Sequence, residues 1–545
     1  MAYFNLGRHT QPVSTTSKKA QRWFDRGIIW CWGFNHEEAA LCFARALFHD
    51  PNLAMAHWGI AHAVGLNYNK GWEDLPPEAR AEMLATAHSQ IDRARALADR
   101  AAPLERALIA ALGARYPTDP ALEDYAPFHA GYAEALRAVL SAHPGDLNVI
   151  ALLAEAMLNR TPWQLWDIRT GQPRPGTDTA EARALLERAF ATHAAAWDHP
   201  GLLHMYIHLM EMSPTPEAAL RHGDRLVTLV PDAGHLIHMG THIDVLTGDY
   251  QAVVERNLAA IQADEKYLAH AGPDNFYTLY RAHNYSFTLY GAMLLGQKAR
   301  ALWAANGVIA ALPESVLRPY ADWFEAFIPK KQHVMIRFGM WREILAQPLP
   351  GDTELYRMTT AIMHYARAIA LANTGGDPSL DRAAFQTARV RVPDTRLLFN
   401  NTCANLLAIA ERMMLGEIAW HAGRHSEALD HLRAAVALDD GLEYDEPWGW
   451  MQPARHALGA LLLEHGELDE AEAVYRADLG LDATLPRPCQ HPGNVWALHG
   501  LHECLTRRGE TVERAHIAAQ LTRALARADV TIRASCYCRG SRGAG

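Results

Sequence analysis

The chain has 545 residues and a formal net charge of −10, with 49% hydrophobic and 21% charged residues. This composition supplies ample material for a core and excludes disorder as the main state of the chain. No long block of Lys or Arg occurs, which argues against nucleic acid as the partner, because phosphate neutralisation needs a basic face. Residues 1–20 lack the apolar core of a signal peptide, and no apolar run reaches membrane-spanning length. With only seven cysteines, we predict a cytoplasmic protein with reduced thiols and no membrane contact.

A repeat of about 34 residues, the length of a tetratricopeptide unit, is visible from Ala20 to Leu53. Bulky and small residues alternate three or four positions apart on two predicted helices. On the first helix these are Trp23, Gly27 and Trp30, and on the second they are Ala39, Phe43 and Ala46. The glycine and alanines allow two antiparallel helices to approach closely. Pro51 closes the unit, and the next predicted helix begins at Ala54.

The same offsets return in the middle of the chain and near its C-terminus. The matching residues are Gly240, Ala252 and Ala259, then Gly416, Ala428 and Leu432, then Gly459, Ala471 and Tyr475, and finally Trp496 and Gly500. No stretch alternates apolar and polar residues for long enough to indicate a β-sheet domain. The sequence therefore predicts an all-α, TPR-like α-solenoid, a right-handed superhelix of antiparallel helix pairs.

Four segments are expected along the chain. They are an N-terminal arm (1–19), an N-terminal solenoid with a histidine-rich centre (20–350), a C-terminal solenoid (351–530) and a tail (531–545). The boundary near 350 follows the Pro/Gly break at 347–351. A further non-helical insertion, Trp163–Thr179, contains two Trp and several Pro and Gly, which indicates an ordered surface loop.

Histidines concentrate between His199 and His242, where seven occur in 44 residues. His204, His208 and Glu211 are spaced i, i+4, i+7, and His235, His238 and His242 are spaced i, i+3, i+7, so each set forms one stripe on a helix. His238 follows His204 by 34 positions, and His242 follows His208 by 34. Because 34 is the repeat length, the two stripes are expected to face the same way on neighbouring helices.

Imidazole nitrogens suit Zn, Cu, Fe or Ni, and i, i+4 ligands on a helix reach a common ion. The two stripes predict a transition-metal site with His204, His208, Glu211, His235, His238 and His242 as ligands and Zn, Fe or Cu as the metal. One metal with surrounding hydrogen-bond partners and a two-metal site both remain open. His283 and Asp264-Glu265 are further candidate ligands. Taken singly, each histidine is more often structural than a ligand.

Two other features carry weaker signals. Cys536-Tyr-Cys538 resembles a thiolate metal clip, but two ligands alone are insufficient, and free thiols are the favoured interpretation; Cys489 and His491 would add to such a clip only if folding brought them near. The segment from Glu443 to Trp450 concentrates three carboxylates and two Trp between helices, and we favour packing over ligand binding for it.

Several motifs resemble those of a group of bacterial tetratricopeptide proteins. The motifs are Pro12–Ser17 with Ala20–Gly27, Gly33-Phe-Asn-His36, Ala54–Gly59, His199-Pro-Gly201, Tyr206-Ile-His208, Ala233–Met239 with Thr241-His242, Tyr444–Pro447, Ala471–Arg476 and Asn494–Leu498. The resemblance covers most of the chain and implies the repeat fold, but it brings no established reaction. The sequence departs from that pattern at Gly240, where Pro is expected, and in an insertion around Leu485–Cys489.

Two functions from different classes follow. The first is a metalloprotein that holds an ion in the solenoid groove, with a small molecule or peptide as ligand; whether it is an enzyme stays open, and hydrolysis or oxidoreduction would depend on the metal. The second is a non-catalytic scaffold that binds a protein or peptide partner. The histidine offset favours the first and fold analogy favours the second.

Overall fold

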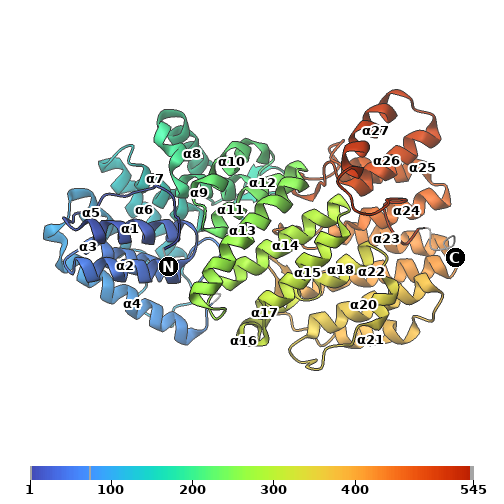
Figure 1. The fold of residues 1–545 in the computed structure, drawn as a ribbon, viewed down its shortest axis with the longest axis horizontal. Coiled ribbons are helices and arrows are strands. Elements are labelled where there is room, and N and C mark those ends of the chain that lie inside the picture. The colour runs from blue at the N-terminus through green and yellow to red at the C-terminus, as the bar shows by residue number, and fades with distance from the viewer. Residues whose placement is uncertain (1–2, 73–74, 540–545) are drawn as a thin grey trace. The chain divides into compact units, whose positions relative to one another are not determined.

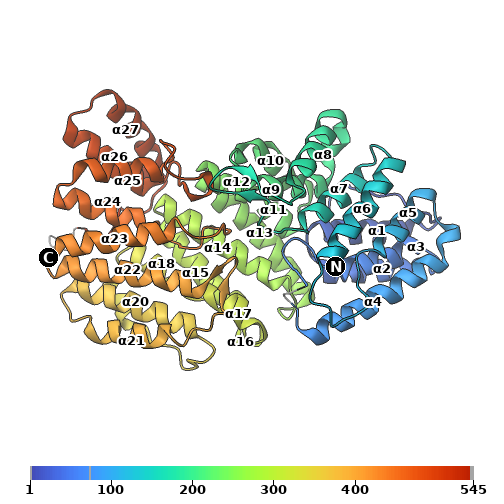
Figure 2. The same ribbon diagram turned by 180° about the vertical axis from the view of Figure 1, so that it is seen from behind.

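The structure is a computed structural model that describes residues 3–72 and 75–539. Residues 1–2 of the predicted N-terminal arm and residues 540–545 of the predicted tail lie outside the described residues. Helices in antiparallel pairs dominate the described chain, as Figures 1 and 2 show, and its only strands form two short hairpins. The predicted all-α, TPR-like solenoid architecture is confirmed.

The chain forms two compact units. Unit 1 comprises Met1–Ile243, Gln262–His270 and Asn275–Tyr277, and unit 2 comprises Asp244–Ile261, Ala271–Asp274 and Thr278–Gly545. The division predicted near residue 350 falls inside unit 2 and stays a prediction.

Unit 1 contains the helix pairs of the N-terminal part of the chain. Its α-helices are α1 (Lys18–Trp32), α2 (His36–His49), α3 (Ala54–Ala63), α4 (Pro77–Ala96), α5 (Pro103–Leu112), α6 (Ala126–Ala142), α7 (Leu147–Leu158), α8 (Thr179–Thr192), α9 (Pro200–Met210), α10 (Leu220–Leu229) and α11 (Gly234–His238). The short 3₁₀ turns are η1 (Ala98–Arg100), η2 (Ala194–Asp198) and η3 (Pro216–Ala219). Helices α12 (Gly240–Thr247) and α13 (Tyr250–Ala271) contribute residues to both units.

Unit 2 continues the same architecture. Its α-helices are α14 (Thr278–Leu295), α15 (Lys298–Ala311), α16 (Glu314–Leu317), α17 (Ala321–Phe324), α18 (Lys330–Arg337), α19 (Trp341–Ala346), α20 (Arg357–Thr374), α21 (Ser379–Arg389), α22 (Cys403–His421), α23 (His425–Asp439), α24 (Ala454–His465), α25 (Leu468–Asp478), α26 (Val495–Arg508) and α27 (Val512–Leu525). The 3₁₀ turns are η4 (Arg318–Tyr320), η5 (Glu325–Phe327) and η6 (Arg487–Cys489).

The two hairpins occupy connecting segments. Strands β1 (Trp166–Asp167) and β2 (Gln172–Pro173) pair antiparallel in unit 1, with Trp166 opposite Pro173. They lie inside the insertion predicted from its Trp, Pro and Gly residues, which is ordered and not helical. Strands β3 (Leu397–Leu398) and β4 (Asn401–Thr402) pair in the same way in unit 2.

Small residues set the close approach between helices. Phe43 on α2 lies between Gly27 on α1 and Gly59 on α3, and a Cβ added at either glycine would come within 2.6 Å of its ring. Tyr475 on α25 has the same relation to Gly459 on α24 and Gly500 on α26, where an added Cβ would lie 2.5 and 2.1 Å away. These are the small and aromatic positions of the predicted repeats. At these two places an aromatic ring fills the space that the absent glycine side chains leave between helices.

Helix contacts in unit 1 are mostly between helices one or two apart along the chain, and a longer-range contact positions the candidate site. Helix α1 packs against α2 and α3, as expected for a helix-pair array, and also against α9. The contact between α1 and α9 brings the end of the first helix beside the histidine-rich segment. Among the described residues, no helix is both long enough and apolar enough to cross a membrane.

Candidate metal centre

The six predicted ligands come from three short, buried helices of unit 1. Helix α9 begins at Pro200, where proline is favoured, and His199 caps it by accepting the backbone N–H of Leu202 at 3.2 Å. It carries His204 and His208, and Glu211 directly follows its last residue. Helix α11 carries His235 and His238, and α12 carries His242 (Figure 1). All six side chains are at most 1% exposed. They form one cluster, which we call the histidine cluster.

His204, His208 and His235 each place one ring nitrogen within 4.8 Å of the other two. Zn–N bonds of about 2.0–2.1 Å at the tetrahedral angle would place such nitrogens about 3.3 Å apart. Small side-chain rotations therefore suffice to bring all three onto one ion. The equivalence predicted from the 34-residue offset pairs His204 with His238. In the structure the ring of His204 lies 4.7 Å from that of His208 and 5.0 Å from that of His235, measured between centroids.

A backbone carbonyl fixes the ring of His204. Its Nδ1–H donates to the Trp32 carbonyl at the end of α1, at 2.6 Å. That bond assigns the proton to Nδ1 and leaves Nε2 as a lone pair, and among the described residues Nε2 has no hydrogen-bond partner. In a metal-ligating histidine, one ring nitrogen typically donates its N–H to a carbonyl or carboxylate while the lone pair of the other binds the metal, and the buried ring of His204 has this arrangement. Burial also lowers the pKa of His204 to about 3, which keeps the ring neutral, as metal binding requires.

Glu211 joins the two histidine stripes through both of its oxygens. His208 Nδ1 donates to Oε1 at 3.0 Å, and His242 Nδ1 donates to Oε2 at 2.6 Å. The carboxylate therefore directs Nε2 of His208 toward His204 and His235. The sequence predicted Glu211 as a ligand, which stays a prediction; its two hydrogen bonds in unit 1 also match those of a carboxylate that orients ligating imidazoles.

His238 and His242 form a second pair within the cluster. Their Nε2 atoms are 2.8 Å apart, and Thr241 Oγ1 lies 3.3 Å from Nδ1 of His238. Because His242 Nδ1–H is committed to Glu211, its Nε2 is the acceptor of this bond in the neutral state. The pair thus extends a hydrogen-bond chain that runs from His208 through Glu211 and His242 to His238.

An aromatic residue that the sequence analysis did not single out as functional covers the three imidazoles. The ring of Phe34 lies 4.5 Å from that of His204, 5.9 Å from His208 and 5.2 Å from His235, measured between centroids. Phe34 has φ of 55°, a left-handed conformation that costs about 1–3 kcal/mol for a bulky residue and tends to persist at functional sites. The motif Gly33-Phe-Asn-His36 was the only signal for it. Its neighbour Asn35 caps α2, since its side chain accepts the Glu38 N–H.

Of the further candidate ligands, Asp264 and His283 occupy separate units. Asp264 lies in unit 1, where it adds to burial in raising the pKa of Tyr277 well above its usual range. The Tyr277 hydroxyl accepts the backbone N–H of His235 at 3.0 Å, so it supports the cluster through the backbone. His283 lies in unit 2, where its ring is 5.0 Å from Phe287 and 5.3 Å from Phe399.

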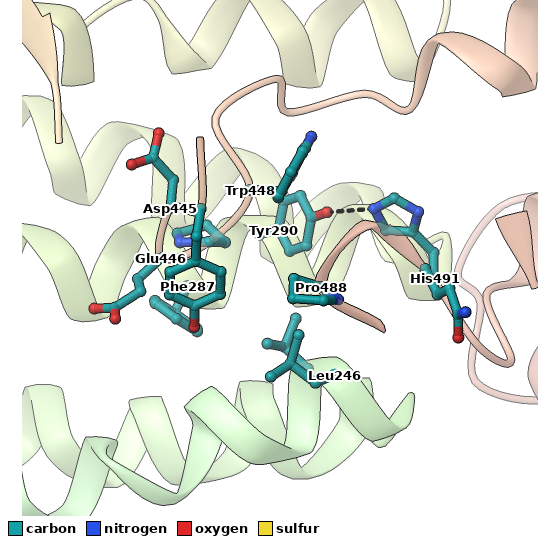
Figure 3. Close-up of a pocket in the computed structure, with 12 residues that line it drawn as sticks. Leu246, Phe287, Tyr290, Asp445, Glu446, Trp448, Pro488 and His491 are labelled. Atoms are coloured by element: carbon teal, nitrogen blue, oxygen red, sulfur yellow. Dashed lines mark hydrogen bonds between the residues drawn. The ribbon is translucent and has the colours of Figure 1, made fainter. Parts of the chain in front are cut away.

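The acidic and aromatic segment from Glu443 to Trp450 lines a cavity of about 20 Å³ in unit 2 (Figure 3). A space of that size holds one water. Tyr290 Oη donates to Nε2 of His491 at 2.8 Å, and Nδ1 of His491 donates to Asp478 at 2.9 Å. Trp448 Nε1 donates to Asp439 at 2.9 Å. These internal partners favour the packing interpretation of the segment. Among the described residues, the group of candidate ligands that contains Cys536 and Cys538 does not include His491.

Comparison with known proteins adds no functional assignment. No family model matches the sequence, and no curated protein matches it. Among solved structures, a monomeric mutant of IFIT1 with Gppp-AAAA aligns at 10% identity and a TM-score of 0.33, covering 93% of this chain and 91% of that chain. Naa15/Naa10 bound to HypK-THB aligns at 14% identity and a TM-score of 0.21, covering 93% and 70%. The APC/C hetero-tetramer Cut9-Hcn1 aligns at 13% identity and a TM-score of 0.25, covering 94% and 97%. These scores are too low to carry an argument about function.

Proposed function

We propose that this chain is a metalloprotein in which His204, His208 and His235 hold one transition-metal ion inside a TPR-like solenoid. The observation that carries the proposal is the buried convergence of three imidazole nitrogens within 4.8 Å, with the Nδ1 atoms of His204 and His208 already committed to oxygen acceptors. Three neutral imidazoles form the ligand set of known catalytic zinc sites, and imidazole also suits iron and copper.

Three protein ligands leave one coordination position for water or substrate. The hydrocarbon ring of Phe34 lies within 5.9 Å of all three rings, measured between centroids, and offers no donor atom. An ion bound there would activate a water molecule for hydrolysis, or oxygen if the metal is iron or copper. Because every imidazole of the set is buried, we propose a small molecule as the ligand of the ion in preference to a protein segment.

We further propose that the chain belongs to the bacterial tetratricopeptide group that its motifs resemble. The motif residues Phe34, His208, His235 and His242 meet in the histidine cluster although they lie far apart in the sequence. A shared function at this cluster would explain why those motifs occur together. A cytoplasmic location accompanies this proposal.

Metal analysis of the tag-free protein tests the proposed function. We expect elemental mass spectrometry to find near one equivalent of Zn, Fe or Cu in the wild type, and a fall of about tenfold or more in the His204→Ala/His235→Ala variant, because one remaining imidazole cannot hold the ion.

The matched control removes two exposed histidines, His465→Ala/His516→Ala, and keeps the metal content of the wild type. A folded wild type that takes up none of the three metals on reconstitution would reject the metal site and leave the scaffold function. Equal losses in both double variants would also reject it.

A further inference from the structure

The C-terminal segment 531–539 is anchored to unit 2 by buried contacts. The Ser535 carbonyl accepts Nη1 of Arg337 at 2.8 Å, and the Ser535 hydroxyl donates to the His456 carbonyl at 2.8 Å while it pairs with the Tyr475 hydroxyl at 2.6 Å. Ser535 is 1% exposed. The two cysteines that follow are therefore held in place against the helices of unit 2.

These cysteines meet a carboxylate from a distant part of the sequence. One oxygen of Glu417, on α22, lies within 4.8 Å of the sulfurs of Cys536 and Cys538, which are themselves joined as a disulfide. Glu417 is 1% exposed and Cys538 is 2% exposed. The sequence signalled only the two sulfurs; the fold supplies a third donor atom.

Within the described part of the chain, Glu417 has no compensating cation. Its Oε2 accepts Nδ2 of Asn373 at 2.8 Å, and among residues 3–72 and 75–539 it forms no ion pair. A buried carboxylate without a paired charge is costly unless it is protonated or coordinates a cation.

We propose that Cys536 and Cys538, in their reduced form, and Glu417 constitute a second metal site, which binds Zn²⁺. Two thiolates and a carboxylate carry three negative charges within 4.8 Å, and a divalent cation offsets most of that repulsion. The thiolates exclude Mg²⁺ and Ca²⁺ as preferred ions, and the hard carboxylate favours Zn²⁺ over Cu(I). A water would complete the four-coordinate shell.

The bound ion would tie segment 531–539 to α22 and so stabilise the end of the solenoid. The disulfide and the metal site are alternative states of the same two sulfurs. A phosphine reductant converts the disulfide and one water to two thiols and a phosphine oxide, and Zn²⁺ binding then releases the two thiol protons. This site shares no residue with the histidine cluster and does not depend on the proposed function.

Cobalt substitution tests the site, because thiolate ligands give Co²⁺ an intense near-ultraviolet charge-transfer band that imidazole ligands do not give. The full chain is reduced with a phosphine, freed of it without oxygen and titrated with Co²⁺. We expect one equivalent of the band, its displacement by Zn²⁺, and its loss in Cys536→Ser/Cys538→Ser. In Glu417→Gln we expect the band to appear at about tenfold or more higher Co²⁺ concentration.

Cys504→Ser, which removes a buried free thiol in unit 2, serves as control and keeps the band. The inference is overturned if reduced wild type binds Co²⁺ without the band, if the band survives in the double serine variant, or if Glu417→Gln titrates like wild type. Loss of the histidine-cluster metal would leave this band unchanged, so failure of either site is recognised separately.

Discussion

Replacing Glu211 by alanine is expected to lower the affinity of the histidine cluster for its metal by about 10- to 100-fold, the usual effect of removing a carboxylate that orients ligating imidazoles. Both carboxylate oxygens accept imidazole N–H groups, at 3.0 and 2.6 Å. Without them His208 and His242 lose the partner that fixes their ring orientation. The affinity is measured by competition with a chromophoric chelator.

Two further variants test whether the loss of metal affinity comes from the carboxylate of Glu211. Glu211→Gln should fall between wild type and alanine, because an amide offers one acceptor oxygen where the carboxylate offers two. Glu155→Ala also removes a buried carboxylate of unit 1, one that lies 3.6 Å from His62, and should leave the metal affinity unchanged. Equal affinities for Glu211→Ala and wild type would show that Glu211 does not orient the ligands.

Replacing Gly201 by alanine is expected to destabilise the protein by about 1–3 kcal/mol. An added Cβ on this residue of α9 would lie 2.5 Å from the ring of Trp32, which is 1% exposed and has no free space to move into. Trp32 also supplies the carbonyl that holds His204. The same substitution should therefore weaken metal binding as well as lower the free energy of unfolding, measured by urea titration.

Gly131→Ala is the matched control, because Gly131 also lies inside a helix of unit 1 and its nearest neighbour to an added Cβ is 3.9 Å away. Alanine there should stabilise the protein by about 0.5–1 kcal/mol through its higher helix propensity. If the two alanine substitutions change the free energy of unfolding in the same direction, crowding against Trp32 does not determine the effect of Gly201→Ala.

The fold could be predicted because its determinants are local. Gly27, Phe43 and Gly59 occur at fixed offsets, and the structure packs the ring of Phe43 against both glycines. Tyr475 likewise packs against Gly459 and Gly500, although the insertion around Leu485–Cys489 lengthens the offset to the second glycine from 16 to 25 residues. Close helix approach needs small residues at set positions, and the sequence displays those positions directly.

The candidate site could be predicted only in part. Helical spacing predicted that His204 and His208 share one stripe, and the repeat length predicted that the stripe of histidines beginning at His235 lies beside it. The role of Glu211 depends on side-chain rotamers that spacing does not fix. The Trp32 carbonyl and the ring of Phe34 reach the cluster through the packing of α1 on α9, a contact between segments about 170 residues apart in sequence.

The proposed zinc site at Cys536, Cys538 and Glu417 could likewise be predicted only in part from the sequence. Cys536 and Cys538 are recognisable as a pair because they are two residues apart, and no sequence pattern relates them to Glu417. That carboxylate resembles any helical glutamate in the sequence. Its burial without an ion pair appears only after α20, α22 and the C-terminal segment have packed together.

The most direct test of the central claim is anomalous X-ray diffraction from crystals of the tag-free, metal-loaded protein, collected at the absorption edge of the ion. The account predicts one strong anomalous peak within about 2.0–2.2 Å of Nε2 of His204, Nε2 of His208 and a ring nitrogen of His235. Fully loaded crystals with no anomalous peak at the histidine cluster would contradict it, whether or not a peak appears at Cys536 and Cys538.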